Sequence, residues 1–127
     1  MLSFITTDAA ITKEALQKAL SDDVNDTYNM ISVDGDTSTN DSVVLLANGM
    51  AENEVITVDS ESYKTFAEAL HEINEYLAKK IAGDGEGATA LFEVTVVGAD
   101  TKETAKTLAK SIVCSNLTKA AIAGHDA

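Results

Sequence analysis

A long stretch of helical periodicity in the middle of the chain limits its possible folds most strongly. Between Ser62 and Ile81, apolar side chains recur at intervals of three and four, and charged side chains cover the other face. This pattern predicts an amphipathic helix with one buried face. The helix is expected to end in the segment 83–87 (GDGEG), where glycines make its continuation costly. The apolar set is Tyr63, Phe66, Leu70, Ile73, Leu77 and Ile81, and the charged set is Lys64, Glu68, Glu72, Glu75 and Lys79.

Shorter segments on both sides of this helix predict a mixed fold. Short apolar runs indicate strands, whereas helical spacing and an Asp100-x-x-Glu103 capping box indicate two further helices. The mixed order predicts the α+β (mixed α/β) class, with a subdomain boundary near residues 83–90. The 45% of hydrophobic residues suffice for a core in a chain of 127 residues. The expected strands are 1–6, 30–33, 42–47 (buried) and 91–97, and the expected helices are 9–20 and a segment that starts at Asp100 and carries Ala105, Leu108 and Ile112.

The charge balance argues against two kinds of partner. With 9 basic against 21 acidic residues and a net charge of −12, the chain lacks the cations that displace phosphate counterions, so neither nucleic acid nor an anionic membrane is expected. No segment reaches the length of a transmembrane helix. The single cysteine excludes an internal disulfide and fits a reducing compartment. We therefore expect a soluble, cytoplasmic protein.

The loop 34–41 resembles the start of a calcium-binding loop. Oxygen-bearing side chains alternate along it, but Thr39 stands where the glycine is required and Leu45 where the bidentate glutamate is required. The favoured interpretation is a loop held by Asx and Ser/Thr side-chain bonds to the backbone.

Two other patterns resemble reactive sites only in part. His71 opens a helical motif of the zinc-protease kind, but Glu75 replaces the second histidine, so His71 is expected to be an ordinary helix residue. Cys114 lies among apolar helical neighbours and is expected to be a packing thiol. His125 lies near the end of the sequence with nothing to pair with. No metal or cofactor is predicted.

The turn 83–87 allows two interpretations of Glu86. It matches neither a dinucleotide-binding fingerprint nor a P-loop, because it follows a helix and not a strand. On its residues alone, the favoured interpretation is a helix C-cap and turn with solvated acids. The alternative is that Gly85 and Gly87 let a ligand approach closely while the Glu86 carboxylate pairs with its amine.

Longer strings carry a specific resemblance. FITTDAAI at 4–11, VDGDTSTND at 33–41, LLANGMA at 45–51, DGEGATA at 84–90 and AKSIVCSNLTKAAIAGHDA at 109–127 occur in this order in the β-chain of glutamate N-acetyltransferases (ornithine acetyltransferases). The chain resembles that β-chain over essentially its whole length.

The resemblance implies a fold and a reaction. Members of this family resemble N-terminal-nucleophile enzymes and adopt an αββα layered sandwich. A precursor cleaves itself before a threonine, and the α- and β-chains remain associated, as an α2β2 assembly. The freed threonine takes the acetyl group of N-acetylornithine as an acetyl-enzyme and passes it to glutamate, a step of arginine biosynthesis, and some members also use acetyl-CoA. A terminal threonine carries its own general base in its α-amine.

The resemblance also assigns site residues. The glutamate of the family's DGEGAT string matches Glu86, a substrate-contacting position, and a carboxylate suits an ornithine ammonium. The ligand contact thereby becomes the favoured interpretation of Glu86. The resemblance assigns no role to individual residues of the 33–41 string, which keeps its structural interpretation.

The sequence departs from the family pattern in three places. The family's β-chain begins Thr-Met-Leu, so the nucleophile is expected immediately before Met1 and has no position in this chain, which leaves no catalytic residue within it. Ala90 stands where the family typically has lysine, and the sequence stops at Ala127, where the family continues with a C-terminal portion that contributes to the substrate site.

We therefore expect residues 1–127 to be a partial β-chain that is inactive in isolation. Such a fragment is also expected to self-associate through exposed apolar surface. The competing hypothesis is a non-catalytic acidic interaction module, whose open strand edges, such as Leu2–Thr6, would receive a partner.

Overall fold

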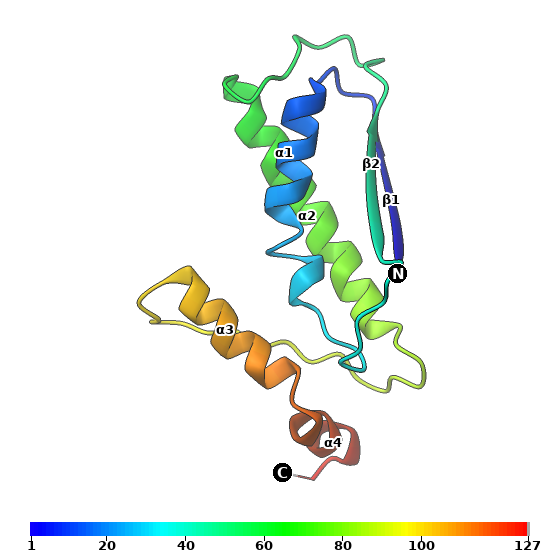
Figure 1. Ribbon diagram of the computed structural model, residues 1–127, viewed down its shortest axis with the longest axis vertical. Coiled ribbons are helices and arrows are strands. Elements are labelled where there is room, and N and C mark those ends of the chain that lie inside the picture. The colour runs from blue at the N-terminus through cyan, green and yellow to red at the C-terminus, as the bar shows by residue number, and fades with distance from the viewer. Residues whose placement is uncertain (127) are drawn as a thin grey trace. The chain divides into compact units, whose positions relative to one another are not determined.

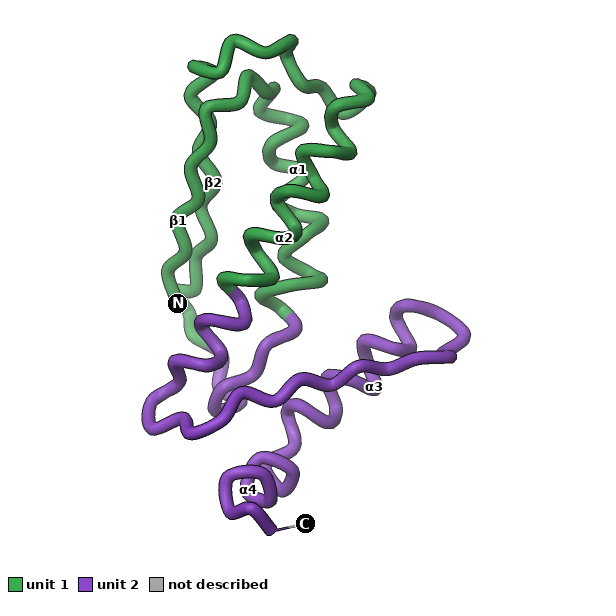
Figure 2. The backbone as a smooth tube through the Cα atoms, turned by 180° about the vertical axis from the view of Figure 1, so that it is seen from behind, with its two compact units in different colours: residues 1–29, 38–77 green, residues 30–37, 78–127 purple. Residues whose placement is uncertain are grey.

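The computed structural model describes residues 1–126 and confirms a mixed helix and strand fold (Figure 1). The chain divides into two compact units, the first formed by residues 1–29 and 38–77 and the second by residues 30–37 and 78–127 (Figure 2). The division passes through the long helix, and the turn at 83–87 lies inside the second unit. The elements are β1 Leu2–Thr7, α1 Lys13–Asp23, a 3-10 helix Tyr28–Met30, β2 Ser42–Ala47, α2 Glu61–Gly83, α3 Lys102–Val113 and α4 Asn116–Gly124.

The first unit packs two helices on one face of a small parallel sheet. β1 and β2 pair in parallel, in a register that runs from Leu2 opposite Ser42 to Thr7 opposite Ala47. Alternate residues of β1 point to opposite faces, so that Ser3 and Ile5 are buried. The core on this side is formed by Ile5, Ala19 and Leu70, together with the half-buried Val43, Leu45, Tyr63, Phe66 and Leu77. The predicted helix 62–81 and strands 1–6 and 42–47 are thus confirmed, although β2 is only half-buried.

The other face of this sheet is apolar and open. Leu2 and Phe4 on β1 are 69% and 66% exposed, and Leu46 on β2 is 54% exposed. The register places Leu2 and Phe4 on the same face as Leu46, because Thr6 pairs with Leu46. Parallel sheets are normally covered on both faces. The β1–β2 sheet departs from this rule, because within residues 1–126 its second apolar face is exposed.

A chain of hydrogen bonds crosses the interior of the first unit from β1 to the surface of α2. The Ser3 hydroxyl donates to Tyr28 Oη (2.9 Å), and the Tyr28 hydroxyl donates to Asn74 Oδ1 (3.2 Å). Asn74, which is fully buried, donates through Nδ2 to Asp23 Oδ2 (2.6 Å). Asp23 Oδ1 in turn accepts from Nδ1 of His71 (2.6 Å). His71 is thus an ordinary helix residue, as predicted, at the exposed end of this network.

The helix predicted at 9–20 forms later in the chain than expected. Thr12 itself has an extended backbone, and Ile11 forms a parallel bridge with Ile56. The Thr12 hydroxyl accepts a hydrogen bond from the backbone N–H of Ala15, which makes Thr12 the N-cap of α1. The cap decides where the helix begins, and the apolar spacing alone does not locate it.

The strand predicted at 30–33 is wrong. The 3-10 helix ends at Met30, and the backbone after it is bound by lysine side chains of the second unit and by no neighbouring strand. Lys110 Nζ donates to the carbonyl of Ile31 (2.9 Å), and Lys119 Nζ donates to the carbonyl of Val33 (2.8 Å). Ammonium groups thus occupy carbonyls that a sheet ladder would use.

The strand predicted at 91–97 is wrong as well, since this segment has no ladder partner among residues 1–126. Figure 2 shows it as an extended stretch that leads to α3. It is held in the second unit by an ion pair between Lys79 Nζ and Glu93 Oε2 (3.0 Å). Val97 is 86% exposed. The alternating pattern identified an extended backbone, but a strand also needs a neighbour to pair with.

The two C-terminal helices correct two further predictions. Thr101, and not Asp100, caps α3, because its hydroxyl accepts from the N–H of Thr104 (3.1 Å). Cys114 ends α3 and is exposed, so the prediction of a packing thiol is wrong. A second cap at Ser115 starts α4 directly afterwards, and His125 closes that helix in a left-handed conformation. None of the helices within residues 1–126 is long and apolar enough to cross a membrane.

Candidate functional site

Glu86 lies on a tight turn directly after the long helix. The backbone N–H of Asp84 still bonds to the carbonyl of Lys80 (3.0 Å), and Gly83 is the last residue of α2. The following turn is closed by a hydrogen bond from Ala88 N–H to Gly85 O (2.8 Å), with Glu86 as its second residue. The geometry presents the Glu86 side chain at the tip of an ordered turn, where it is exposed.

Each glycine beside Glu86 has a structural reason. A Cβ on Gly85 would meet Cγ1 of Val33 at 2.9 Å, so this position must be small. Gly87 has a φ of +72°, a backbone conformation that residues with a side chain rarely adopt. The glycines therefore serve the turn and the packing of the segment 30–37. Close approach of a ligand is not needed to explain them.

The Glu86 carboxylate is left available for chemistry. Across residues 1–126 it takes part in no hydrogen bond or ion pair, and it projects from a backbone that is fixed on both sides. An exposed, unpaired carboxylate of this kind can accept charge-assisted hydrogen bonds from an ammonium group. The turn reading and the ligand reading of Glu86 are thus compatible, since the turn holds the backbone and leaves the side chain open.

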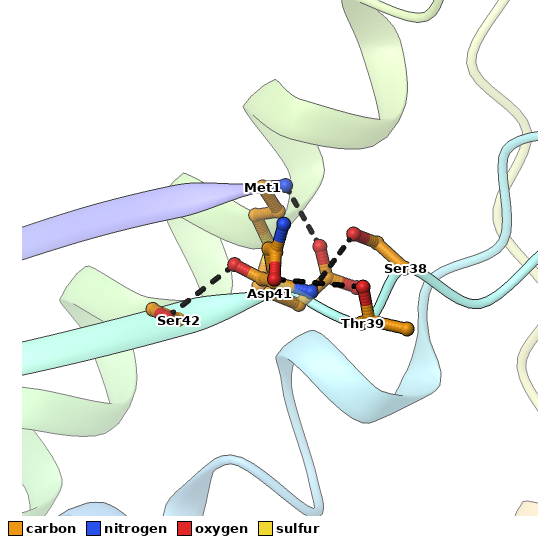
Figure 3. Close-up of polar contacts among 6 residues, drawn as sticks. Met1, Ser38, Thr39, Asp41 and Ser42 are labelled. Atoms are coloured by element: carbon orange, nitrogen blue, oxygen red, sulfur yellow. Dashed lines mark hydrogen bonds and ion pairs between the residues drawn. The ribbon is translucent and has the colours of Figure 1, made fainter.

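A second polar arrangement surrounds the start of β1. The amino group of Met1 lies 2.7 Å from Asp41 Oδ1 (Figure 3). The backbone N–H of Ser42 donates to the Met1 carbonyl (3.1 Å). The backbone N–H of Asn40 donates to Ser38 Oγ (3.1 Å), which fixes the turn just before Asp41. The segment 38–41 therefore lies against the first residue of the chain.

The loop interpretation of residues 34–41 is confirmed in its local bonds. Within the second unit, the N–H of Asp36 donates to Asp34 Oδ1 (2.9 Å). Within the first unit, the N–H of Asn40 likewise donates to the side chain two residues earlier, at Ser38 Oγ. No group of three or more His, Cys, Asp or Glu side chains that could hold a metal occurs in the part of the chain described by the structure.

The contact between Asp41 and Met1 is the feature that sequence reasoning missed. Forty residues separate the two, and only the parallel pairing of β1 with β2 brings them together. Both strands were predicted, so an assumed pairing in this register would have found the contact. Glu86 belongs to the second unit, and Met1 belongs to the first.

Comparison with known proteins gives consistent matches over the whole chain. A sequence profile of the ArgJ family matches residues 1–127. The chain is 56% identical over 127 residues to the arginine biosynthesis bifunctional protein ArgJ 1 of Clostridium acetobutylicum, covering 100% of this chain and 31% of that relative. It is 54% identical to the ArgJ protein of Thermotoga neapolitana, covering 32% of that relative.

A solved structure agrees with these matches. The crystal structure of the arginine biosynthesis bifunctional protein ArgJ from Bacillus halodurans aligns with a TM-score of 0.95 at 55% identity, over 100% of this chain and 60% of that chain. This agreement supports the N-terminal-nucleophile type of fold expected from the sequence. The chain spans about a third of the length of the curated relatives it matches.

Proposed function

This chain belongs to the ArgJ family, and from that premise we propose that it is part of an enzyme that moves an acetyl group from N-acetylornithine to glutamate. The observation that carries the proposal is the match over the whole chain to proteins named for arginine biosynthesis, with the fold of one of them reproduced at a TM-score of 0.95. The proposed reaction acetylates glutamate in arginine biosynthesis. Use of acetyl-CoA as a second donor is an option of the same site.

The proposed nucleophile is a threonine that immediately precedes Met1 in the longer protein, freed by self-cleavage of a precursor. Its hydroxyl oxygen attacks the acetyl carbonyl of N-acetylornithine while its own α-amine accepts the hydroxyl proton, because the unperturbed pKa of such an amine lies near 8. Ornithine leaves as an amine after taking that proton. The amine of glutamate then attacks the threonine ester, which releases N-acetylglutamate and restores the hydroxyl.

Glu86 is proposed to bind the substrate ammonium group. Support comes from its exposed carboxylate, which has no partner within residues 1–126, and from the hydrogen-bonded turn that carries it. Replacing it by alanine in the complete enzyme is expected to raise KM for N-acetylornithine about 10- to 150-fold, since a charge-assisted hydrogen bond contributes ~1.5–3 kcal/mol. Steady-state kinetics over a range of N-acetylornithine concentrations measure the change. Unaltered KM would return Glu86 to a purely structural role.

The remaining parts of the enzyme are proposed to cover the open apolar face of the first unit. These parts are the α-chain, in an α2β2 assembly, and the C-terminal portion of the β-chain, acting together in the cytoplasm. Support comes from Leu2, Phe4 and Leu46, which face outward from a parallel sheet of the kind that is normally covered on both sides. The same face gives the isolated chain a reason to self-associate.

An acetyl-transfer assay tests the proposed function. The precursor is expected to convert N-acetylornithine and glutamate into ornithine and N-acetylglutamate, whereas the 127-residue chain alone is expected to show no turnover. A precursor in which the threonine before Met1 is changed to alanine provides the control, and it is expected to remain uncleaved and inactive. Turnover by the 127-residue chain alone would contradict the mechanism.

A further inference from the structure

The carboxylate of Asp41 lies where the segment 38–41 meets the start of β1. Asp41 Oδ1 lies 2.7 Å from the Met1 nitrogen, a distance typical of a charge-assisted hydrogen bond. The Met1 side chain is 18% exposed, and the Asp41 side chain is 41% exposed. The two neighbours of Asp41 in the chain are both held by hydrogen bonds from their backbone N–H groups. Asn40 N–H donates to Ser38 Oγ, and Ser42 N–H donates to the Met1 carbonyl.

Asp41 lies beside the Met1 nitrogen at the start of the parallel ladder. The ladder begins with Leu2 opposite Ser42. Thr39 and Asn40 form a turn just before it, and Asp41 joins that turn to β2. The Met1 nitrogen, to which any preceding residue would be joined, lies 2.7 Å from Asp41 Oδ1.

We propose that Asp41 positions the nucleophile of the acetyl-transfer reaction, an inference that rests on the function proposed above. When a threonine precedes Met1, the Met1 nitrogen becomes a peptide N–H, and the proposal requires this N–H to donate its one hydrogen bond to Asp41 Oδ1, where the ammonium group donates in this structure. This bond fixes the plane of the peptide unit that joins the threonine to Met1. Asp41 touches neither the acetyl group nor the threonine hydroxyl, so it is a positioning residue and not a catalytic one.

The contact determines the orientation of a residue with few other constraints. After cleavage, the threonine is the first residue of its chain, so only its link to Met1 and its own side-chain contacts hold its hydroxyl and amine in place. A misplacement of about 1 Å at a reacting group can cost about 100-fold in rate. Loss of the Asp41 bond is therefore expected to lower kcat and to leave KM nearly unchanged, which is the opposite of the pattern expected for Glu86.

The experiment uses the complete precursor of this chain, assayed for self-cleavage on denaturing gels and for acetyl transfer by steady-state kinetics. Asp41→Ala is expected to lower kcat about 10- to 100-fold, or to leave a measurable fraction of uncleaved precursor, with KM for N-acetylornithine within about twofold of wild type. Asp41→Asn keeps one side-chain oxygen as acceptor and is expected to recover most of that loss. Asp36→Ala, which removes an exposed carboxylate from the same loop, is the matched control and is expected to behave as wild type.

The outcomes separate the two proposals. If the wild-type precursor transfers acetyl groups and Asp41→Ala matches it in cleavage, kcat and KM, the positioning role of Asp41 is overturned while the enzyme function stands. An equal loss in Asp41→Asn and Asp41→Ala, with a lowered melting temperature in both, also overturns it, because it shows a structural role only. If the wild-type precursor transfers no acetyl group, the proposed function itself fails.

Discussion

Replacement of the buried Asn74 is the sharpest test of how the first unit is held together. Asn74 is fully buried, and it joins Tyr28 to Asp23 through bonds of 3.2 and 2.6 Å. Asn74→Ala removes both bonds. The bond to the Asp23 carboxylate is charge-assisted and contributes ~1.5–3 kcal/mol, and the bond from Tyr28 contributes ~1 kcal/mol. The expected loss in unfolding free energy is therefore about 2.5–4 kcal/mol, a large share of the ~5–15 kcal/mol typical of a domain.

Urea unfolding of the 127-residue chain, followed by far-UV circular dichroism, measures this loss through the shift of the midpoint at constant slope. Measurements at several protein concentrations are needed, because self-association makes the apparent stability depend on concentration. His71→Ala is the matched control: it removes the exposed end of the same network, where the side chain is 46% exposed, and is expected to cost below about 1 kcal/mol.

A second substitution at the same position is expected to make the free energy of unfolding depend on pH. Asn74→Asp places a buried carboxylate against that of Asp23, which raises the pKa of the introduced group in the folded state. A group with a raised folded-state pKa contributes stability below its unfolded pKa and loses it as the pH rises, so this variant is expected to approach wild type on acidification. The reasoning would be refuted if Asn74→Ala lay within about 0.5 kcal/mol of wild type, or if His71→Ala cost as much.

Two further predictions follow from the packing. Gly85→Ala is expected to destabilise the chain by about 1–3 kcal/mol in urea unfolding, because its Cβ would meet Val33 Cγ1 at 2.9 Å. Val33→Ala in the same chain should restore part of this loss. If the losses in unfolding free energy of the two single variants simply added in the double variant, the clash would be contradicted. Phe4→Ser is expected to weaken self-association, as measured by sedimentation velocity, because it removes an apolar group from the open face of the β1–β2 sheet. Val97→Ser, in the other unit, is the control. An equal effect of the two substitutions would contradict self-association through the open face.

Local periodicity predicted those elements whose formation depends on their own residues. The apolar stripe from Tyr63 to Ile81 predicted α2 within two residues at each end, since an amphipathic face and a glycine stop are both local features. The start of α1 was misplaced, because spacing does not show which hydroxyl caps the helix, and Thr12 does so. The family resemblance identifies Glu86 as a site residue, whereas the residues of the segment 83–87 alone favour a simple turn.

Features that depend on a distant partner were beyond local patterns. The contact of Asp41 with Met1 depends on the register of β1 against β2, which no single segment encodes. The segment 30–33 has a strand-like composition, but its carbonyls are bound by lysines from α3 and α4, about eighty residues further along the chain. In both cases the missing information was a neighbour and not a propensity.

The wrongly predicted strand 91–97 and the open face of the β1–β2 sheet have a common physical cause. A strand needs at least one paired edge, and a strand of a parallel sheet normally has both faces covered. In the 91–97 segment the edges have no ladder partner among residues 1–126, and Val97 remains 86% exposed. In β1 one edge is paired but one face is not covered, which leaves Phe4 66% exposed. Because the chain spans about a third of its relatives' length, these unsatisfied groups are where we expect the rest of the proposed enzyme to bind.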